Sequence, residues 1–124
     1  MGRQRSRSSA PQDKLCLRCG RVIQWRRKWA KDWEHVRYCS KACRSAGLTQ
    51  QDHDIQRVML EALRADGRLE VGAFAQAQGW DASQREAVRM AARRIVMEHP
   101  ASLWQQGRRV DASTARGDFE LRWT

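Results

Sequence analysis

Two short stretches decide how the first part of this chain folds: Cys16-Leu17-Arg18-Cys19 and Cys39-Ser40-Lys41-Ala42-Cys43. A turn with two cysteines three positions apart aims both sulfurs at one point, and two cysteines four positions apart share a helix face. The spacing therefore predicts one structural Zn²⁺ in a tetrahedron of thiolates. Four sulfurs leave no position for a water molecule, so we expect no chemistry at the metal. The predicted ligands are Cys16, Cys19, Cys39 and Cys43.

Other interpretations of the four cysteines stay open, namely two disulfides, unpaired buried thiols, or an iron site of the same four-sulfur type. His35 is close enough in sequence to replace one ligand, although a partly exposed histidine is the expected role. The length of residues 15–47 favours metal, because a core alone rarely holds a segment below roughly 40 residues. Structural zinc contributes about 10 kcal/mol or more, so we expect this segment to unfold without it.

Charge divides the 124-residue chain, whose formal net charge is +10, into parts. Residues 15–47 contain nine Lys and Arg residues against two acids, and residues 1–14 contain four against one, whereas residues 48–124 contain eleven of each. The whole surplus therefore lies before a boundary near Gly47. We expect a disordered basic arm at 1–14, a four-cysteine zinc-binding module at 15–47 and a second domain at 48–124.

Three tryptophans recur every fourth residue between the cysteine pairs, at Trp25, Trp29 and Trp33. That spacing suits one face of a short helix. The rings either form an aromatic surface on which bases stack or a small core that covers the metal site. Basic side chains interleave with them and are candidates for phosphate contact, namely Arg26, Arg27, Lys28 and Lys31.

The run CLRCG, then WRRKWAKDW, then VRYCSKACRSAG, is similar to the family catalogued as domain of unknown function 2256. Its ending YCSKAC resembles the finish of small treble-clef zinc fingers. This resemblance implies Cys16 and Cys19 on a zinc knuckle, with Cys39 and Cys43 opening a helix. Ser40 is well placed to cap that helix. Some treble clefs with this ending bind other proteins, so that class of partner also stays open.

Helical periodicity dominates the second half. Apolar residues repeat at helical spacing over 54–66, a short strand fits 69–71, and a short helix fits 72–78. Asp81 and Ser83 can cap a third helix, Ser83 through a capping box with Glu86, and Pro100 ends that helix after about residue 98. Leu103 to Gln105 and the alternating residues 119–123 predict a hairpin. This order is typical of a winged helix, so the predicted fold class is small α+β, with a treble-clef-like module followed by a winged-helix-like domain.

The same segment resembles the family catalogued as domain of unknown function 3253, in the helical stretch near 85–95 and in the closing GDFELRW. That resemblance implies a winged-helix shape and no known activity. Arginines step four residues apart along the third helix, on the side predicted to face outward, and others lie in the loop of the hairpin. These candidates for DNA contact are Arg85, Arg89, Arg93, Arg108, Arg109 and Arg116.

The sequence favours a nucleic-acid-binding protein with DNA, or a nucleic-acid-associated protein, as partner. A protein-interaction adaptor with exposed Trp and Arg is the alternative. We expect no enzyme and no small-molecule substrate, because none of the three histidines stands beside a plausible nucleophile and no phosphate-binding glycine loop is recognisable. No run of 18 apolar residues exists, so no membrane partner is expected, and four cysteines without an apolar leader suggest a reducing, cytoplasmic location.

Overall fold

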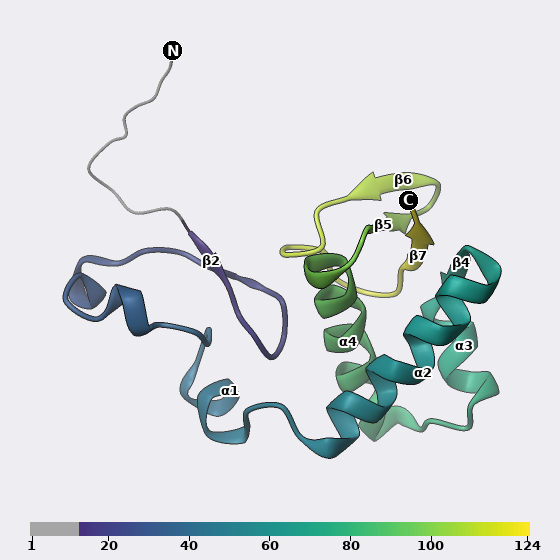
Figure 1. Cartoon of the computed structure of the whole chain (residues 1–124), viewed down its shortest axis with the longest axis horizontal. Helices are drawn as coiled ribbons and strands as arrows, with labels where there is room; N and C mark the ends of the chain where they lie inside the picture. Colours follow the sequence, from purple (N-terminus) through teal and green to yellow (C-terminus); the bar gives the residue numbers. More distant parts are fainter. Residues whose placement is uncertain (1–12) are drawn as a thin grey trace, which may run out of the picture.

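The computed structural model describes residues 13–124, which form two parts that lie side by side (Figure 1). We call residues 13–47 the cysteine module and residues 48–124 the helical unit. All but the last two residues of the expected basic arm fall outside the described residues. Among residues 13–124, none of the helices combines the length and apolar character needed to cross a membrane.

The cysteine module contains little regular structure. Strand β2 (Lys14–Leu15) pairs with the antiparallel strand β3 (Val22–Ile23), and the first cysteine pair lies in the turn between them. Two 3₁₀ turns follow, η1 (Arg27–Trp29) and η2 (Trp33–His35), and the module ends in the six-residue helix α1 (Lys41–Ala46).

The expected single helix across the three tryptophans is wrong, because that segment forms η1 and η2 with a break between them. Helices this short depend on a packed face, since an isolated helix below about 12–15 residues is marginal in water. Trp33 is buried, whereas Trp25 and Trp29 are only partly covered at the edge of the same cluster. The rings therefore do not share one helix face.

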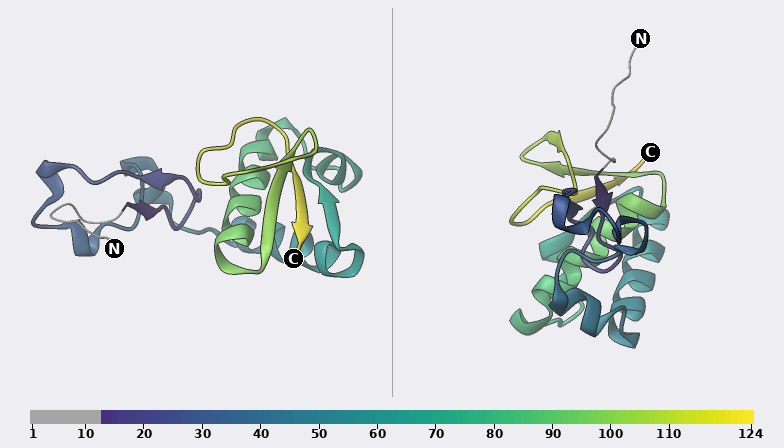
Figure 2. Two further views of the ribbon diagram at one scale, coloured as in Figure 1. Left: turned by 90° about the horizontal axis from the view of Figure 1, so that it is seen from above. Right: turned by 90° about the vertical axis from the view of Figure 1, so that its left-hand side faces the viewer.

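The helical unit is a mixed helix-and-sheet structure. Helix α2 (Gln50–Asp66) leads into β4 (Arg68–Glu70), followed by α3 (Val71–Ala77), η3 (Ala82–Gln84) and α4 (Arg85–Glu98). Three more strands close the chain: β5 (Ala101–Gln105), β6 (Arg108–Val110) and β7 (Glu120–Trp123). The antiparallel sheet has the order β4-β7-β5-β6, and the helices pack together beside it (Figure 2).

The helix starts differ from the sequence predictions in how they are capped. Helix α2 begins before residue 54, because Thr49 and Asp52 form a capping box with distances of 3.1 Å and 2.9 Å. Asp81 is a cap as predicted, but at the start of η3, which precedes the third helix and whose capping box joins Asp81 to Gln84. The predicted box of Ser83 with Glu86 is therefore wrong, since the Asp81 carboxylate already accepts from the Ser83 amide at 3.0 Å.

The predicted terminal hairpin is confirmed in its pairing and extended by one strand. Leu103 in β5 lies opposite Leu121 in β7, as the alternating pattern required. Strand β6 was not predicted, and a tight turn at Gln106 and Gly107, with φ of 51° and 78°, connects it to β5. Both turn residues have positive φ, as the twist of a two-residue hairpin demands.

The core of the helical unit is continuous across helices and sheet. Met59, Leu63, Ile95 and Leu121 are fully buried. They join residues of α3, α4 and β5 in one apolar cluster. Burial of this kind contributes about 25 cal/mol per Å² of apolar surface, and no cysteine takes part in this cluster.

Candidate metal centre and its attachment to the helical unit

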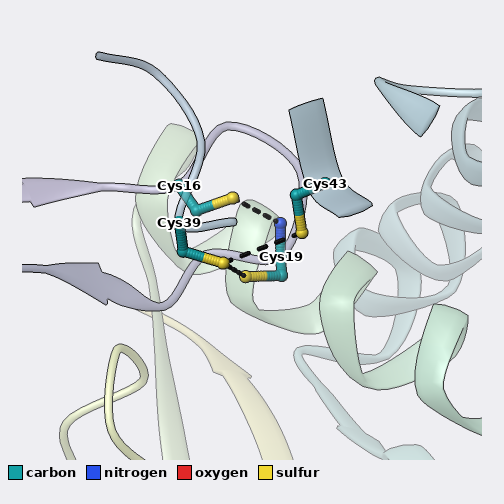
Figure 3. A group of neighbouring side chains, drawn as sticks. All are labelled: Cys16, Cys19, Cys39 and Cys43. Carbon is teal, nitrogen blue, oxygen red and sulfur yellow. Dashed lines mark hydrogen bonds between the residues drawn. The ribbon is translucent and has the colours of Figure 1, made fainter. Parts of the chain in front are cut away.

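All four predicted ligands converge. The sulfur atoms of Cys16, Cys19, Cys39 and Cys43 lie within 4.8 Å of one another, and three of the four residues are buried (Figure 3). The Cys19 and Cys39 sulfurs are 3.5 Å apart, and those of Cys39 and Cys43 are 3.7 Å apart. Four cysteines therefore lie close enough to hold one metal ion.

The donor set fits zinc. A regular tetrahedron with Zn–S bonds of about 2.3 Å has S–S edges of about 3.8 Å, close to the two separations above. Each of the four cysteines is a free thiol in this structure, so two disulfides do not form here. His35 is exposed and is not among the clustered ligand atoms, which agrees with the role expected for it.

The thiols influence one another's protonation. A hydrogen bond from the Cys19 side chain lowers the pKa of Cys16 to about 4, and the same hydrogen bond raises the pKa of Cys19. Burial raises the pKa of Cys39. A divalent ion would replace the thiol protons, since the thiolate is the metal ligand.

Local backbone geometry aims the first pair of sulfurs. The Cys16 carbonyl accepts from the Gly20 amide at 2.9 Å, and the Cys19 amide approaches the Cys16 sulfur at 3.5 Å. Gly20 has a φ of +76°, and a Cβ there would collide with the Cβ of Arg93 in α4. Only glycine combines this turn with so close an approach of the helical unit.

The second pair lies at the start of α1. Cys39 precedes the cap and Cys43 is in the first turn, with the Ser40 hydroxyl accepting from the Cys43 amide at 3.2 Å. The predicted cap by Ser40 is therefore confirmed. This hydrogen bond holds the backbone of Cys43, so the cap that begins α1 also positions the Cys43 sulfur.

Arg94 of α4 joins the cysteine module to the helical unit. Its side chain is fully buried and donates to the Arg18 carbonyl, to the Gln56 side chain at 2.7 Å, and to the Asp52 carbonyl at 3.3 Å. The Asp52 carboxylate, also buried, lies 3.7 Å from the Arg18 guanidinium. Burial lowers the pKa of Arg94, while the nearby Asp52 charge opposes that shift. The first turn of α2, helix α4 and the turn between β2 and β3 thus meet at the Arg94 guanidinium.

Arg93 lies beside Arg94 in α4 and packs against the first cysteine pair. Its guanidinium donates to the Cys19 carbonyl at 3.3 Å and lies 3.7 Å from Glu86, while two of its nitrogens lack a hydrogen-bond partner within the described residues. Burial lowers its pKa, and the Glu86 charge acts in the opposite direction. Four thiolates with one divalent cation carry a net negative charge, so the loaded centre would supply a counter-charge to this cation.

The expected outward row of three arginines on α4 is wrong in this structure. Arg93 is 1% exposed, since the face of α4 opposite the apolar core packs against the cysteine module. Arg89 pairs with Glu86 at 3.1 Å and approaches Asp118 at 3.9 Å, which leaves Arg85 as the exposed member of the row. The other predicted contact residues are exposed, namely Arg26, Arg27, Lys28, Lys31, Arg108, Arg109 and Arg116.

The tryptophans divide between the two roles left open by the sequence. Trp33 is 7% exposed and belongs to the cluster that contains Cys16, Cys19 and Cys43. Trp29 stacks on Trp33 with ring centroids 6.1 Å apart and 14° between planes, and it stays half-exposed. One ring is therefore core, and another carries an accessible aromatic surface.

Sequence reasoning missed the residues that attach the two parts. Arg18, Asp52, Met90 and Arg94 looked like ordinary surface or core positions, yet Met90 packs into the cysteine cluster. A signal was present, because Met90 and Arg94 are four residues apart and define a second face of α4 beside the apolar one. What covers that face is a property of the folded chain.

The structure thus defines a small mixed helix-and-sheet protein with a four-cysteine cluster suited to one metal ion. Residues 6–46 match the family described as "Uncharacterized protein conserved in bacteria (DUF2256)". This match supports the first resemblance drawn from the sequence, whereas the resemblance to domain of unknown function 3253 stays a prediction. Comparison with curated proteins and with solved structures finds no match.

Proposed function

We propose that this chain is a zinc-containing protein that binds nucleic acid, mainly through the basic surface of its cysteine module. The observation that carries the proposal is the exposure of Arg26, Arg27, Lys28 and Lys31 around the half-exposed ring of Trp29. Clustered cations beside an accessible aromatic ring suit phosphates and bases. The surplus of seven positive charges in residues 15–47 adds a long-range attraction for polyanions.

The proposal includes a treble-clef-like cysteine module and a winged-helix-like helical unit. A knuckle followed by a capped helix carrying the last ligand supports the first assignment, and the element order α2, β4, α3, α4 and terminal strands supports the second. In a winged helix, α4 would be the reading helix. Because the cysteine module covers part of it, the proposal gives the helical unit a smaller share of the contact, through Arg108, Arg109 and Arg116.

The proposal assigns no catalysis to the metal centre, since four sulfur ligands leave no open position for substrate or water. The centre would act by holding the basic surface in shape. Four cysteines without a disulfide also suit a reducing compartment such as the cytoplasm.

The test is a salt titration of binding to a fluorescent duplex and a fluorescent single strand. Each neutralised phosphate contributes a slope of about −0.9 on duplex DNA, or about −0.7 on a single strand, to log affinity against log salt. Replacing Arg26, Arg27, Lys28 and Lys31 together by Gln should lower the magnitude of that slope by about 3–4, whereas the triple variant Arg108→Gln, Arg109→Gln and Arg116→Gln should lower it less. An affinity independent of salt would refute the proposal.

A protein-interaction adaptor is the second candidate, and one observation favours it. Leu15 and Leu17 expose 38% and 41% of their surface on the cysteine module, and Leu48 exposes 38% just after it. Exposed apolar side chains beside Trp and Arg are typical of interface hot spots. Partner capture that survives nuclease treatment and is lost in Leu17→Asp, with zinc content unchanged, would favour the adaptor.

A further inference from the structure

The cysteine module contains a pocket formed by η1, η2 and the segment that leads into α1. Its volume is about 380 Å³, within the range of about 300–1,000 Å³ typical of small-ligand pockets. Two aromatic side chains, Trp29 and Tyr38, and two cations, Arg37 and Arg44, line it. Asp32 and His35 add polar groups to the wall, and Val36 adds an apolar one.

The aromatic wall is held in place. Trp29 stacks on the buried ring of Trp33, and the cationic groups of Lys28 and Arg26 lie over the Trp29 ring, 5.2 Å and 5.7 Å from its centroid, where a stacking base would take the place of these flexible side chains. A ring fixed in this way loses little freedom when a flat ligand stacks on it. The Tyr38 ring, also half-buried, adds a second apolar surface to the same pocket.

The charged wall favours an anionic ligand. Arg37 donates to the carbonyls of Glu34 and Val36, which orients its guanidinium while leaving further donors available. No hydrogen bond or ion pair of the Arg44 side chain is found within residues 13–124, and this side chain is exposed. Asp32 supplies a carboxylate that can accept from an exocyclic amino group. Aromatic walls with cations at the rim and one acceptor match a base attached to its phosphate.

We infer that this pocket binds an unpaired nucleobase of a single-stranded nucleic acid, stacked on Trp29, with Arg44 on the adjoining phosphate. The inference rests on the proposed function and sharpens it, because a base within a duplex is already stacked and paired. It names single-stranded or looped nucleic acid as the preferred partner. Trp29, Tyr38 and Arg44 are its binding residues.

The experiment compares two fluorescent oligomers with the same number of phosphates, about 12, one of oligodeoxycytidylate, whose bases carry an exocyclic amino group, and one fully abasic. Zinc-loaded full-length protein should bind the base-bearing oligomer about 5- to 150-fold more tightly, the factor that corresponds to about 1–3 kcal/mol per stacked base. Equal affinity for both oligomers would overturn the pocket and leave phosphate binding intact. Failure to bind either oligomer would refute the proposed function as well.

Variants locate the base. Trp29→Ala should reduce the ratio between the two oligomers to about twofold or less, while Trp29→Phe should keep most of it because a phenyl ring still stacks. Zinc content and the amide spectrum of each variant report whether the module is intact. If Trp29→Ala unfolds, the affinity ratio between the two oligomers, measured for Trp29→Phe and for the wild type, tests the site instead. If Trp29→Ala folds and keeps the wild-type ratio, the site is overturned.

Arg44→Gln provides the charge test, with Arg64→Gln as the matched control that removes the same charge from the exposed surface of α2. Arg44→Gln should weaken binding of both oligomers several-fold more than Arg64→Gln does and should lower the salt slope by about 0.7. Equal effects of the two variants would mean that Arg44 contributes only to the overall positive charge and makes no local contact with a phosphate. That result would overturn its assignment.

Discussion

The cysteine module and the helical unit bury their side chains in opposite ways. Three of the five residues that the module itself contributes to its buried cluster are cysteines, joined by Ile23 and Trp33, and Met90 comes from the helical unit. The helical unit buries fifteen apolar residues from helices and strands in one cluster. The cysteine module therefore buries too few apolar side chains of its own to fold without a metal or its neighbour, whereas the helical unit has a core of its own.

Removal of one ligand should have the largest effect. Cys43→Ser is expected to lose most of the metal-coupled stabilisation, about 10 kcal/mol for a site of this class, and the module should unfold. Heteronuclear NMR of the full chain should show collapsed amide dispersion for residues 13–47 and retained dispersion for 50–124. Retained dispersion in both parts would contradict the comparison, because the module would then have a sufficient core of its own.

Truncation of the apolar core should show the reverse pattern. Met59 is fully buried in α2, and Met59→Ala should destabilise the helical unit by about 2–5 kcal/mol through lost burial and a cavity. Urea denaturation followed by circular dichroism measures the change, and zinc stoichiometry in native buffer should stay at one ion. Leu17→Ala, at an exposed position, is the control and should change stability by about 0.5 kcal/mol or less.

The next largest effect is expected from a substitution at the junction between the cysteine module and the helical unit. Arg94→Met keeps apolar bulk at a buried position but removes the donors to Arg18, Gln56 and Asp52. Leaving buried acceptors without a donor should cost about 1–3 kcal/mol. Hydrogen exchange should accelerate at amides of the knuckle and at the start of α2, and Arg64→Met should leave both unchanged. Unaltered exchange in Arg94→Met would mean that the two parts do not depend on this side chain.

The smallest predicted effect comes from removing the side-chain cap at the start of α1 or of α2. Ser40→Ala and Thr49→Ala each remove a side-chain acceptor at a helix start and should each cost about 1 kcal/mol. Because folding and metal binding are coupled in the module, Ser40→Ala should weaken zinc affinity about fivefold, whereas Thr49→Ala should leave it unchanged. Competition with a chromophoric chelator measures both. Equal zinc affinities of the two variants would contradict the coupling.

Much of this organisation was predictable from local patterns. The four ligands followed from their spacing, the Ser40 cap from its position, and the helix over 54–66 from its apolar repeat. Spacing suffices there because a short loop or a helix face fixes the geometry. The start of α2 at Gln50 was missed because Thr49 and Asp52 extend the helix beyond its apolar stripe.

The remainder depends on contacts between distant segments. Arg93 looked exposed because its own helix places it away from the apolar stripe, and nothing in its local sequence shows that the turn between β2 and β3 packs over it. The two 3₁₀ turns at Trp29 and Trp33 were also missed because they depend on distant contacts. A four-residue repeat favours a helix only where a partner covers its apolar face. Pairing across more than 70 residues, as between Arg18 and Arg94, lies beyond such patterns.

The most direct measurement is native mass spectrometry of the purified chain before and after treatment with a strong chelator, with an amide spectrum recorded on each sample. One zinc ion per chain should be present at first, and its loss should coincide with the disappearance of dispersed signals from residues 13–47. An identical mass and an unchanged spectrum after chelation would show that no metal holds the cysteine module together.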